Sequence, residues 1–258
     1  MKIYDCFIFN HEIELLEIRL NILNDYVDKF IITEGDITFS GLPKESHFLK
    51  NKDRFKKWED KIILNQIKIP DLEGPWHREI YSRNAVLDLD IFKDDDLIIM
   101  SDGDEIPNPE IIEHTSEWIS SDTHFTFEQS CYAYWINNLY SREWFGTRAA
   151  TYKYMKNKTV DDVREGTEDE SKITGSTITN GGWHFTYLGN EDHIRQKINS
   201  FCDRHFDVPE VTENISKNLS EGNDVLNRSH IKYQRVDLDD SFPQYILNNK
   251  EKYSHLIK

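Results

Sequence analysis

The alternation of apolar and polar segments predicts strands and helices that follow one another through the first hundred residues. Short apolar runs have the length and composition of buried strands at 3–9, 28–33, 61–68 and 94–100. Helices are predicted between them at 11–24 and 76–89, with a loop and short helix at 44–57. Strands that alternate with helices predict a mostly parallel sheet joined by crossover helices.

The pattern changes after residue 109. Segment 124–135 alternates with a period of two and is rich in aromatic residues, which predicts a long, half-buried strand, and 147–155 predicts another. Segment 161–179 is polar and predicts a surface loop that contains Glu168, Asp169 and Glu170. Further helices are predicted at 191–206 and in the tail, 241–258.

Length and composition favour a folded α/β protein. The chain has 258 residues, of which 38% are hydrophobic and 12% aromatic, and it shows neither an internal repeat nor a linker. We therefore expect a single domain over 1–258. The formal net charge of −16 disfavours nucleic acid and anionic membranes as partners. It also opposes a bound nucleotide diphosphate unless a metal and local arginines invert the sign.

The cysteines and the apolar segments bear on the compartment. Cys6, Cys131 and Cys202 are widely spaced and odd in number, which is typical of reduced thiols. No apolar stretch approaches the roughly 20 residues of a membrane span, and the chain opens directly on a predicted strand. We expect a cytoplasmic protein without a signal peptide or a transmembrane anchor.

A predicted strand that ends in acids indicates a ligand site. Segment 98–107 runs from Ile-Ile-Met into Asp102, Asp104 and Glu105 and closes with a proline. Ligands of open α/β sheets bind at the carboxyl ends of the strands, and acids there suit a hard divalent cation that holds a phosphate. This Asp-x-Asp arrangement is typical of glycosyltransferases that use nucleotide sugars. An ordinary acidic turn after a strand remains the alternative.

Four blocks, in order along the chain, resemble glycosyltransferase family 17, the β-1,4-mannosyl-glycoprotein 4-β-N-acetylglucosaminyltransferase family. The blocks are 9–20, 27–34, 102–107 and 182–184. The resemblance implies a GT-A-type, Rossmann-like transferase fold with a mostly parallel central sheet. It also implies UDP-N-acetylglucosamine as the donor, Mn²⁺ or Mg²⁺ as the cofactor, and an inverting transfer to a glycan acceptor. The expected linkage is β-1,4.

The resemblance implies a metal site with candidate ligands Asp102, Asp104 and His184. Asp104 is the first candidate for a direct ligand, whereas Asp102 is expected to reach the ribose or a metal-bound water. Glu105 is expected to brace the loop. Carboxylate and imidazole groups suit Mn²⁺, and carboxylates alone suit Mg²⁺. For His184 a purely structural role beside Trp183 remains open.

Nucleotide contacts are expected from Asn10, Glu12 and Glu34, which follow the first two predicted strands. Glu12 is equally well explained as a first-turn acid that interacts with a helix dipole, and Glu34 as an exposed turn acid.

Three arginines are candidates for the donor diphosphate: Arg78 and Arg83 in the helix before the acidic strand, and Arg164 in the polar segment. Arg78 and Arg83 resemble family positions and can pair with diphosphate or brace the aspartates, with a surface ion pair as the alternative. Arg164 resembles a family arginine and is expected to close over the phosphates.

An inverting transfer needs a general base near the acceptor hydroxyl group. Glu191 is our first candidate and Asp192 the second, because an acid follows the Gly-Trp-His block in the family as well. Their alternative role is that of acids at a helix N-terminus. Aromatic residues are expected to divide between an acceptor groove and the core: Tyr132, Tyr134, Trp135 and Trp144.

Two other functions stay open at this stage. One is a transferase of the same fold that uses another nucleotide sugar, and the other is a carbohydrate-binding module without turnover. The intact Asp102, Asp104 and His184 argue against the second. In each enzyme interpretation the partners are a nucleotide sugar and a glycan acceptor.

Overall fold

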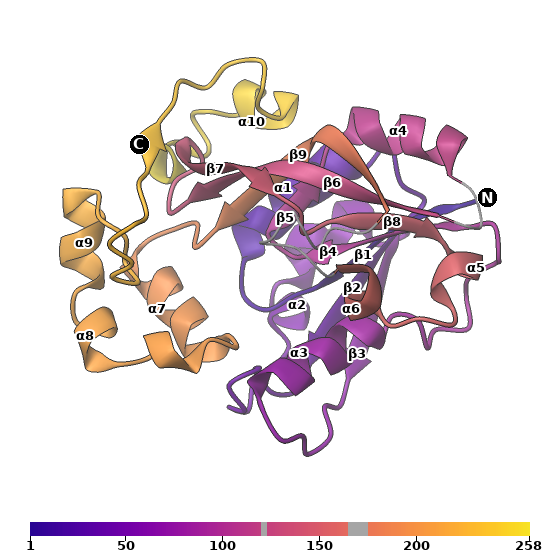
Figure 1. The fold of residues 1–258 in the computed structure, drawn as a ribbon, viewed down its shortest axis with the longest axis horizontal. Helices are drawn as coiled ribbons and strands as arrows, with labels where there is room; N and C mark the ends of the chain where they lie inside the picture. The colour runs from indigo at the N-terminus through magenta and orange to yellow at the C-terminus, as the bar shows by residue number, and fades with distance from the viewer. Residues whose placement is uncertain (120–122, 165–174) are drawn as a thin grey trace.

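The protein is built on one mixed β-sheet with helices packed around it (Figure 1). The computed structural model describes residues 1–119, 123–164 and 175–258. Within these ranges the sheet has ten strands in the order β10-β7-β6-β8-β4-β1-β2-β3, with β9 beside β6 and β5 beside β9. The α/β class predicted from the sequence is confirmed.

The parallel part of the sheet comes from the first hundred residues. Its strands are β1 (Ile3–Ile8), β2 (Lys29–Gly35), β3 (Ile62–Ile67) and β4 (Leu97–Asp102). β1 pairs with both β2 and β4, and β2 pairs with β3. Apolar runs form these strands because helices cover both faces of a parallel sheet. The register sets Ile8 beside Asp102, so β1 and β4 end side by side.

The later strands make the sheet mixed. They are β5 (Glu105–Pro107), β6 (His124–Ala133), β7 (Asn138–Trp144), β8 (Arg148–Thr151), β9 (Ser176–Thr186) and β10 (Gln234–Arg235). β8 joins β4 to β6 through antiparallel pairs, and β6 pairs in parallel only with β9. The parallel pairing that we predicted holds for the first four strands. Short connections such as the one between β6 and β7 permit only antiparallel neighbours.

The helices of the described residues are short. They are α1 (Ile13–Leu23), α2 (His47–Lys50), α3 (Pro75–Asn84), α4 (Pro109–Trp118), α5 (Tyr152–Met155), α6 (Val160–Arg164), α7 (Glu191–Ser200), α8 (Pro209–Thr212), α9 (Ile215–Glu221) and α10 (Gln244–Asn248). Three 3₁₀ helices accompany them: η1 (Lys52–Trp58), η3 (Arg204–Phe206) and η4 (Ser254–Leu256). In Figure 1, α7, α8 and α9 lie together at one end of the molecule.

Several predicted boundaries were wrong. Residues 152–155, predicted as strand, form α5 because the Thr151 side chain accepts a hydrogen bond from the Tyr154 amide and caps a helix there. The predicted loop 161–179 contains the end of α6 and the start of β9. Its acids Glu168, Asp169 and Glu170 lie outside the described residues. The helix predicted at 76–89 ends at Asn84, and the one predicted at 191–206 ends at Ser200.

The hydrophobic core contains apolar side chains and free cysteines. Phe30, Ile99 and Phe127 are fully buried in the largest hydrophobic cluster. The cysteines Cys6, Cys131 and Cys202 are buried and free, as expected for reduced thiols. Across the described ranges, every helix is too short or too polar to cross a membrane.

Candidate active site

A cleft of about 720 Å³ opens where β1, β2 and β4 end. This volume falls in the range that holds a small-molecule ligand. Among the described residues that line it, seven carry carboxylates: Glu12, Glu79, Asp102, Asp104, Asp161, Asp162 and Asp203. Five others are basic: Lys44, Arg83, Arg164, Lys197 and Arg228. The acidic excess of the whole chain therefore persists in the cleft.

A buried arginine holds the turn that bears the predicted acidic motif. Arg19 of α1 donates to both carboxylate oxygens of Asp5 at 2.6 and 2.8 Å, and both side chains are fully buried. The same guanidinium donates to the carbonyl oxygens of Asp102 (3.1 Å) and Glu105 (2.6 Å). It also donates to the Ser101 hydroxyl at 2.5 Å. The hydrogen bonds of Arg19 thus link the turn after β4 to α1 and β1.

Glu105 braces the turn, as the sequence suggested. Its buried carboxylate accepts from the Asp102 amide at 2.9 Å and from the Trp144 indole at 2.8 Å. It also receives two bonds from the Arg164 guanidinium, at 2.9 and 3.2 Å. A side chain at Gly146 would overlap this carboxylate, so only glycine fits there. Glu105 therefore has no free oxygen to offer a ligand.

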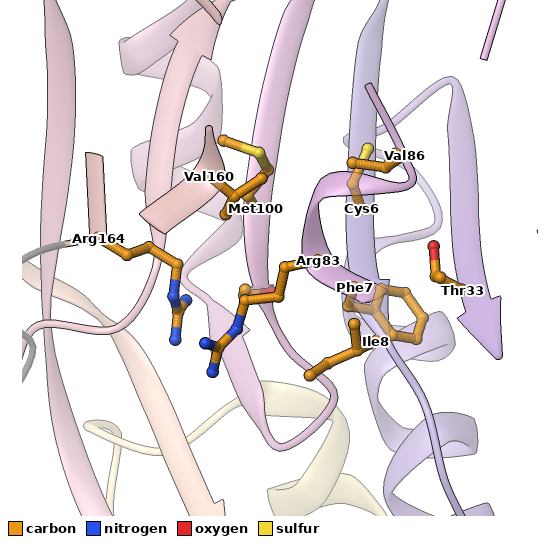
Figure 2. Close-up of a pocket in the computed structure, with 10 residues that line it drawn as sticks. Cys6, Phe7, Ile8, Thr33, Arg83, Val86, Met100, Val160 and Arg164 are labelled. Carbon is orange, nitrogen blue, oxygen red and sulfur yellow. The ribbon is translucent and has the colours of Figure 1, made fainter. Parts of the chain in front are cut away.

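Asp102 lies between two arginines. Arg83 of α3 donates to both carboxylate oxygens, at 3.0 and 2.9 Å, and Arg164 of α6 donates to one of them at 3.1 Å. Burial alone would raise the pKa of Asp102, but Arg164 and Arg83 outweigh it and lower the pKa to about 2. Figure 2 shows the two guanidinium groups side by side.

Asp104 lies on the other side of the turn and faces different partners. Its Oδ2 is 2.5 Å from the Lys197 Nζ and 3.3 Å from the His184 Nε2. Burial opposes its charge, yet Lys197 and His184 hold the pKa of Asp104 below its usual value. Burial likewise opposes the charge of His184, but Cys131 and Asp104 raise its pKa well above the usual value. Asp104 is therefore an ionised carboxylate between a lysine and a histidine.

The candidate metal ligands are only partly brought together. Asp104, which directly precedes β5, and His184 on β9 contact each other, whereas Asp102 is turned toward its two arginines. No group of three histidine, cysteine or acidic side chains among residues 1–119, 123–164 and 175–258 is arranged to hold a metal. A carboxylate and a neutral imidazole suit Mn²⁺, so a metal bound here would require His184 to lose its proton and would take its other ligands from phosphates and water.

The expected nucleotide contacts separate into two groups. Asn10 and Glu12 line the cleft, where Asn10 donates to the Ser200 hydroxyl at 2.8 Å. Glu34 is not among the described cleft residues, because its buried carboxylate accepts from the His47 amide at the start of α2 (2.6 Å). It is therefore neither an exposed turn acid nor a cleft residue. Arg78 likewise points elsewhere and donates to the Phe39 carbonyl oxygen at 2.7 Å.

The two candidates for the general base lie at the N-terminus of α7. Glu191 is paired with Arg195 at 2.8 Å, and this pairing lowers the pKa of Glu191. Neither Glu191 nor Asp192 belongs to the described residues that line the cleft. The acids that do line its wall include Glu79 and Asp203, which sequence reasoning did not single out. Burial raises the pKa of Glu79.

Sequence reasoning also missed Lys197 and the aromatic wall. Lys197 lies next to the buried Ile198 on α7, and its position gives no signal in the sequence beyond that of an ordinary helix lysine. Of the four aromatic residues proposed for an acceptor groove, Trp144 lines the cleft, whereas Tyr132 and Tyr134 belong to the core. The other aromatic residues that line the cleft are Phe9, Phe39, Trp76, Tyr140, Tyr187, Phe201, Phe206 and Tyr233.

An α/β fold with a cleft at the strand ends is typical of proteins that bind a ligand there. The model of glycosyltransferase family 17 matches residues 1–258, and the chain belongs to this family. Two relatives are the β-1,4-mannosyl-glycoprotein 4-β-N-acetylglucosaminyltransferases of Rattus norvegicus and Homo sapiens. Each is 22% identical over 96% of this chain and 53% of its own length. The chain thus spans about half the length of these relatives.

Solved structures give weaker similarities. TarS of S. aureus has a TM-score of 0.43 at 12% identity, and the match covers 84% of this chain and 75% of that chain. The galactosyltransferase LgtC has a TM-score of 0.38 at 11% identity, with 63% of this chain and 62% of that chain covered.

Proposed function

We infer that this glycosyltransferase moves N-acetylglucosamine from UDP-N-acetylglucosamine to a glycan acceptor, with inversion and a β-1,4 linkage, and that it requires Mn²⁺ or Mg²⁺. The observation that carries the proposal is the contact between Asp104 and His184 in a cleft at the strand ends. The names of the relatives support N-acetylglucosamine as the transferred sugar and the β-1,4 linkage.

The charge of the cleft supports the need for a cation. Its seven described carboxylates outnumber its five lysines and arginines before any ligand enters. A nucleotide diphosphate would add further negative charge to the same space. A divalent ion on Asp104 and His184 would neutralise the departing diphosphate and act as a Lewis acid.

The protein's own residues supply positioning and proton transfer in this scheme. The acceptor oxygen forms a bond to the anomeric carbon while the bond from that carbon to the β-phosphate oxygen breaks. UDP leaves, and the acceptor proton passes to a carboxylate of the cleft. Arg83 and Arg164 hold Asp102 in place and lie close enough to the turn to stabilise the leaving phosphates.

Binding measurements test the proposal directly. Unfolding temperatures of the wild type should rise more with UDP and Mn²⁺ together than with either alone, and UDP-N-acetylglucosamine should be hydrolysed faster than GDP or TDP sugars. Asp104→Asn should lose the joint effect, whereas Glu110→Gln, an exposed residue of α4, should keep it. A preference for GDP or TDP sugars would show that the donor is a different nucleotide sugar. Separate, merely additive effects of nucleotide and metal would contradict the metal-dependent mechanism.

A further inference from the structure

Lys197 stands where the proposed cation should interact with the protein. Its ammonium group is 2.5 Å from the Asp104 Oδ2, the same oxygen that faces the His184 imidazole. Resting on the proposed function, we propose that Lys197 couples cation binding to nucleotide binding. It neutralises Asp104 in the free protein and transfers to the donor diphosphate when the cation binds.

The first step of the argument is competition for one oxygen. A cation held between Asp104 and His184 would lie next to the Oδ2 that Lys197 now contacts, because that oxygen faces the imidazole. An ammonium group and a divalent ion repel each other at contact distance. A buried carboxylate attracts whichever of the two it pairs with more strongly than an exposed one would. The cation alone therefore binds weakly, because it must first displace Lys197.

The second step is the destination of the ammonium group. Lys197 lines the cleft, and its side chain is 18% exposed on a flexible stem. Its second acidic neighbour is Glu12, whose Oε1 is 3.5 Å from Nζ, and the Tyr187 ring lies 5.3 Å away. Glu12 alone is a poor substitute for Asp104 at this distance. A nucleotide diphosphate in the cleft supplies the missing anionic partner.

The other basic residues of the turn are not suited to this exchange. Arg83 is fixed by two bonds to Asp102 and by an ion pair with Glu79. Arg164 is fixed by bonds to Asp102 and Glu105. Lys197 instead has one short ion pair, with the Asp104 oxygen that faces His184, and a longer one with Glu12.

Reciprocal coupling follows from this geometry. If UDP lowers the free-energy cost of moving Lys197, UDP must increase the affinity of the protein for the cation. The cation must then increase the affinity for UDP by the same factor. Coupling between two sites commonly amounts to roughly 5- to 150-fold in affinity. Removal of the ammonium group should abolish most of the coupling between cation and UDP. The same change should strengthen the binding of the cation in the absence of UDP.

The test measures Mn²⁺ affinity by electron paramagnetic resonance and calorimetry, with and without UDP. In the wild type, UDP should tighten Mn²⁺ about 5-fold or more. In Lys197→Met, Mn²⁺ alone should bind more tightly than in the wild type, and the effect of UDP should shrink toward 1-fold. Arg195→Met, on the same helix but partly exposed, should match the wild type. Lys197→Gln repeats the test if the methionine variant does not fold, as judged by circular dichroism.

The outcomes separate the two proposals. A lysine variant that keeps both the wild-type Mn²⁺ affinity and the wild-type coupling overturns the role of Lys197 and leaves the proposed function intact. A wild type that binds UDP and Mn²⁺ without mutual effect, or binds neither, overturns the proposed function and the coupling together.

Discussion

Arg19→Met is the substitution with the largest expected effect on both the fold and the site. Arg19 neutralises Asp5 inside the protein, and neither side chain is exposed to solvent. It also donates to the carbonyl oxygens of Asp102 and Glu105. Methionine fills a similar volume but leaves a buried carboxylate without its cation and the turn without its anchor.

The magnitude follows from the loss of a buried ion pair. Removal of one partner of such a pair costs roughly 3–5 kcal/mol, because the remaining charge stays buried. In a protein of this size, 1 kcal/mol corresponds to about 2–4 °C in Tm, so Tm should fall by roughly 6–20 °C. Arg54→Met is the matched control, because Arg54 pairs with Glu17 at the surface, where a pair contributes about 0–1 kcal/mol.

The assay is urea unfolding, monitored by tryptophan fluorescence and circular dichroism, followed by a UDP titration with Mn²⁺. Asp5→Leu combined with Arg19→Met should be roughly 1–3 kcal/mol more stable than the sum of the two single changes predicts, because no charge is then left buried. The anchoring argument would be refuted if Arg19→Met cost no more than Arg54→Met, or if it lowered stability without any effect on UDP affinity.

Three further predictions concern the surroundings of the site. Gly146→Ala should cost roughly 1–3 kcal/mol and weaken UDP binding, because the new methyl group displaces the Glu105 carboxylate; unchanged calorimetric binding would contradict this. Burial raises the pKa of Asp224, but Arg228 and Tyr233 outweigh it and lower the pKa below its usual 3.8. Its contribution to stability is present above about pH 4 and is lost as the pH falls through the folded-state pKa. The Tm difference between the wild type and Asp224→Asn should therefore narrow below pH 4, and a constant difference would exclude the charge as its cause. Glu34→Gln should lower Tm and leave UDP affinity intact; lost affinity at an unchanged Tm would restore the nucleotide contact expected from the sequence.

The sequence predicted the part of the site that depends on local pattern. Four apolar runs identified the strands β1 to β4, and the acids after β4 lie at the edge where ligands of such sheets bind. Glu105 was expected to brace the loop, and it does so. A buried parallel strand needs a continuous apolar run, so its position can be read from one segment of the chain.

Contacts between distant segments were beyond the reach of such patterns. Lys197 and Asp104 are far apart in the chain, and nothing in the neighbourhood of either residue predicts that they meet. Glu34 gives a second example, in which the nucleotide contact stays a prediction. A strand-end position indicated a ligand contact, but the amide groups at the start of α2 already occupy its carboxylate. The position of a residue along a strand can be predicted from the local sequence. Its side-chain contacts depend on the packing of elements that are distant in the sequence.

The pairing of acids and bases bears on how so acidic a chain would bind the phosphates of the proposed donor. A buried carboxylate without a partner is costly, so Asp102 and Asp104 each require a nearby cation if they are to stay ionised at the sheet edge. The cations that satisfy this requirement are Arg83, Arg164 and Lys197. Each of them lines the same cleft. The acids therefore gather the positive charges that an anionic donor needs, and a metal ion that takes over Asp104 would release one of those charges to the diphosphate.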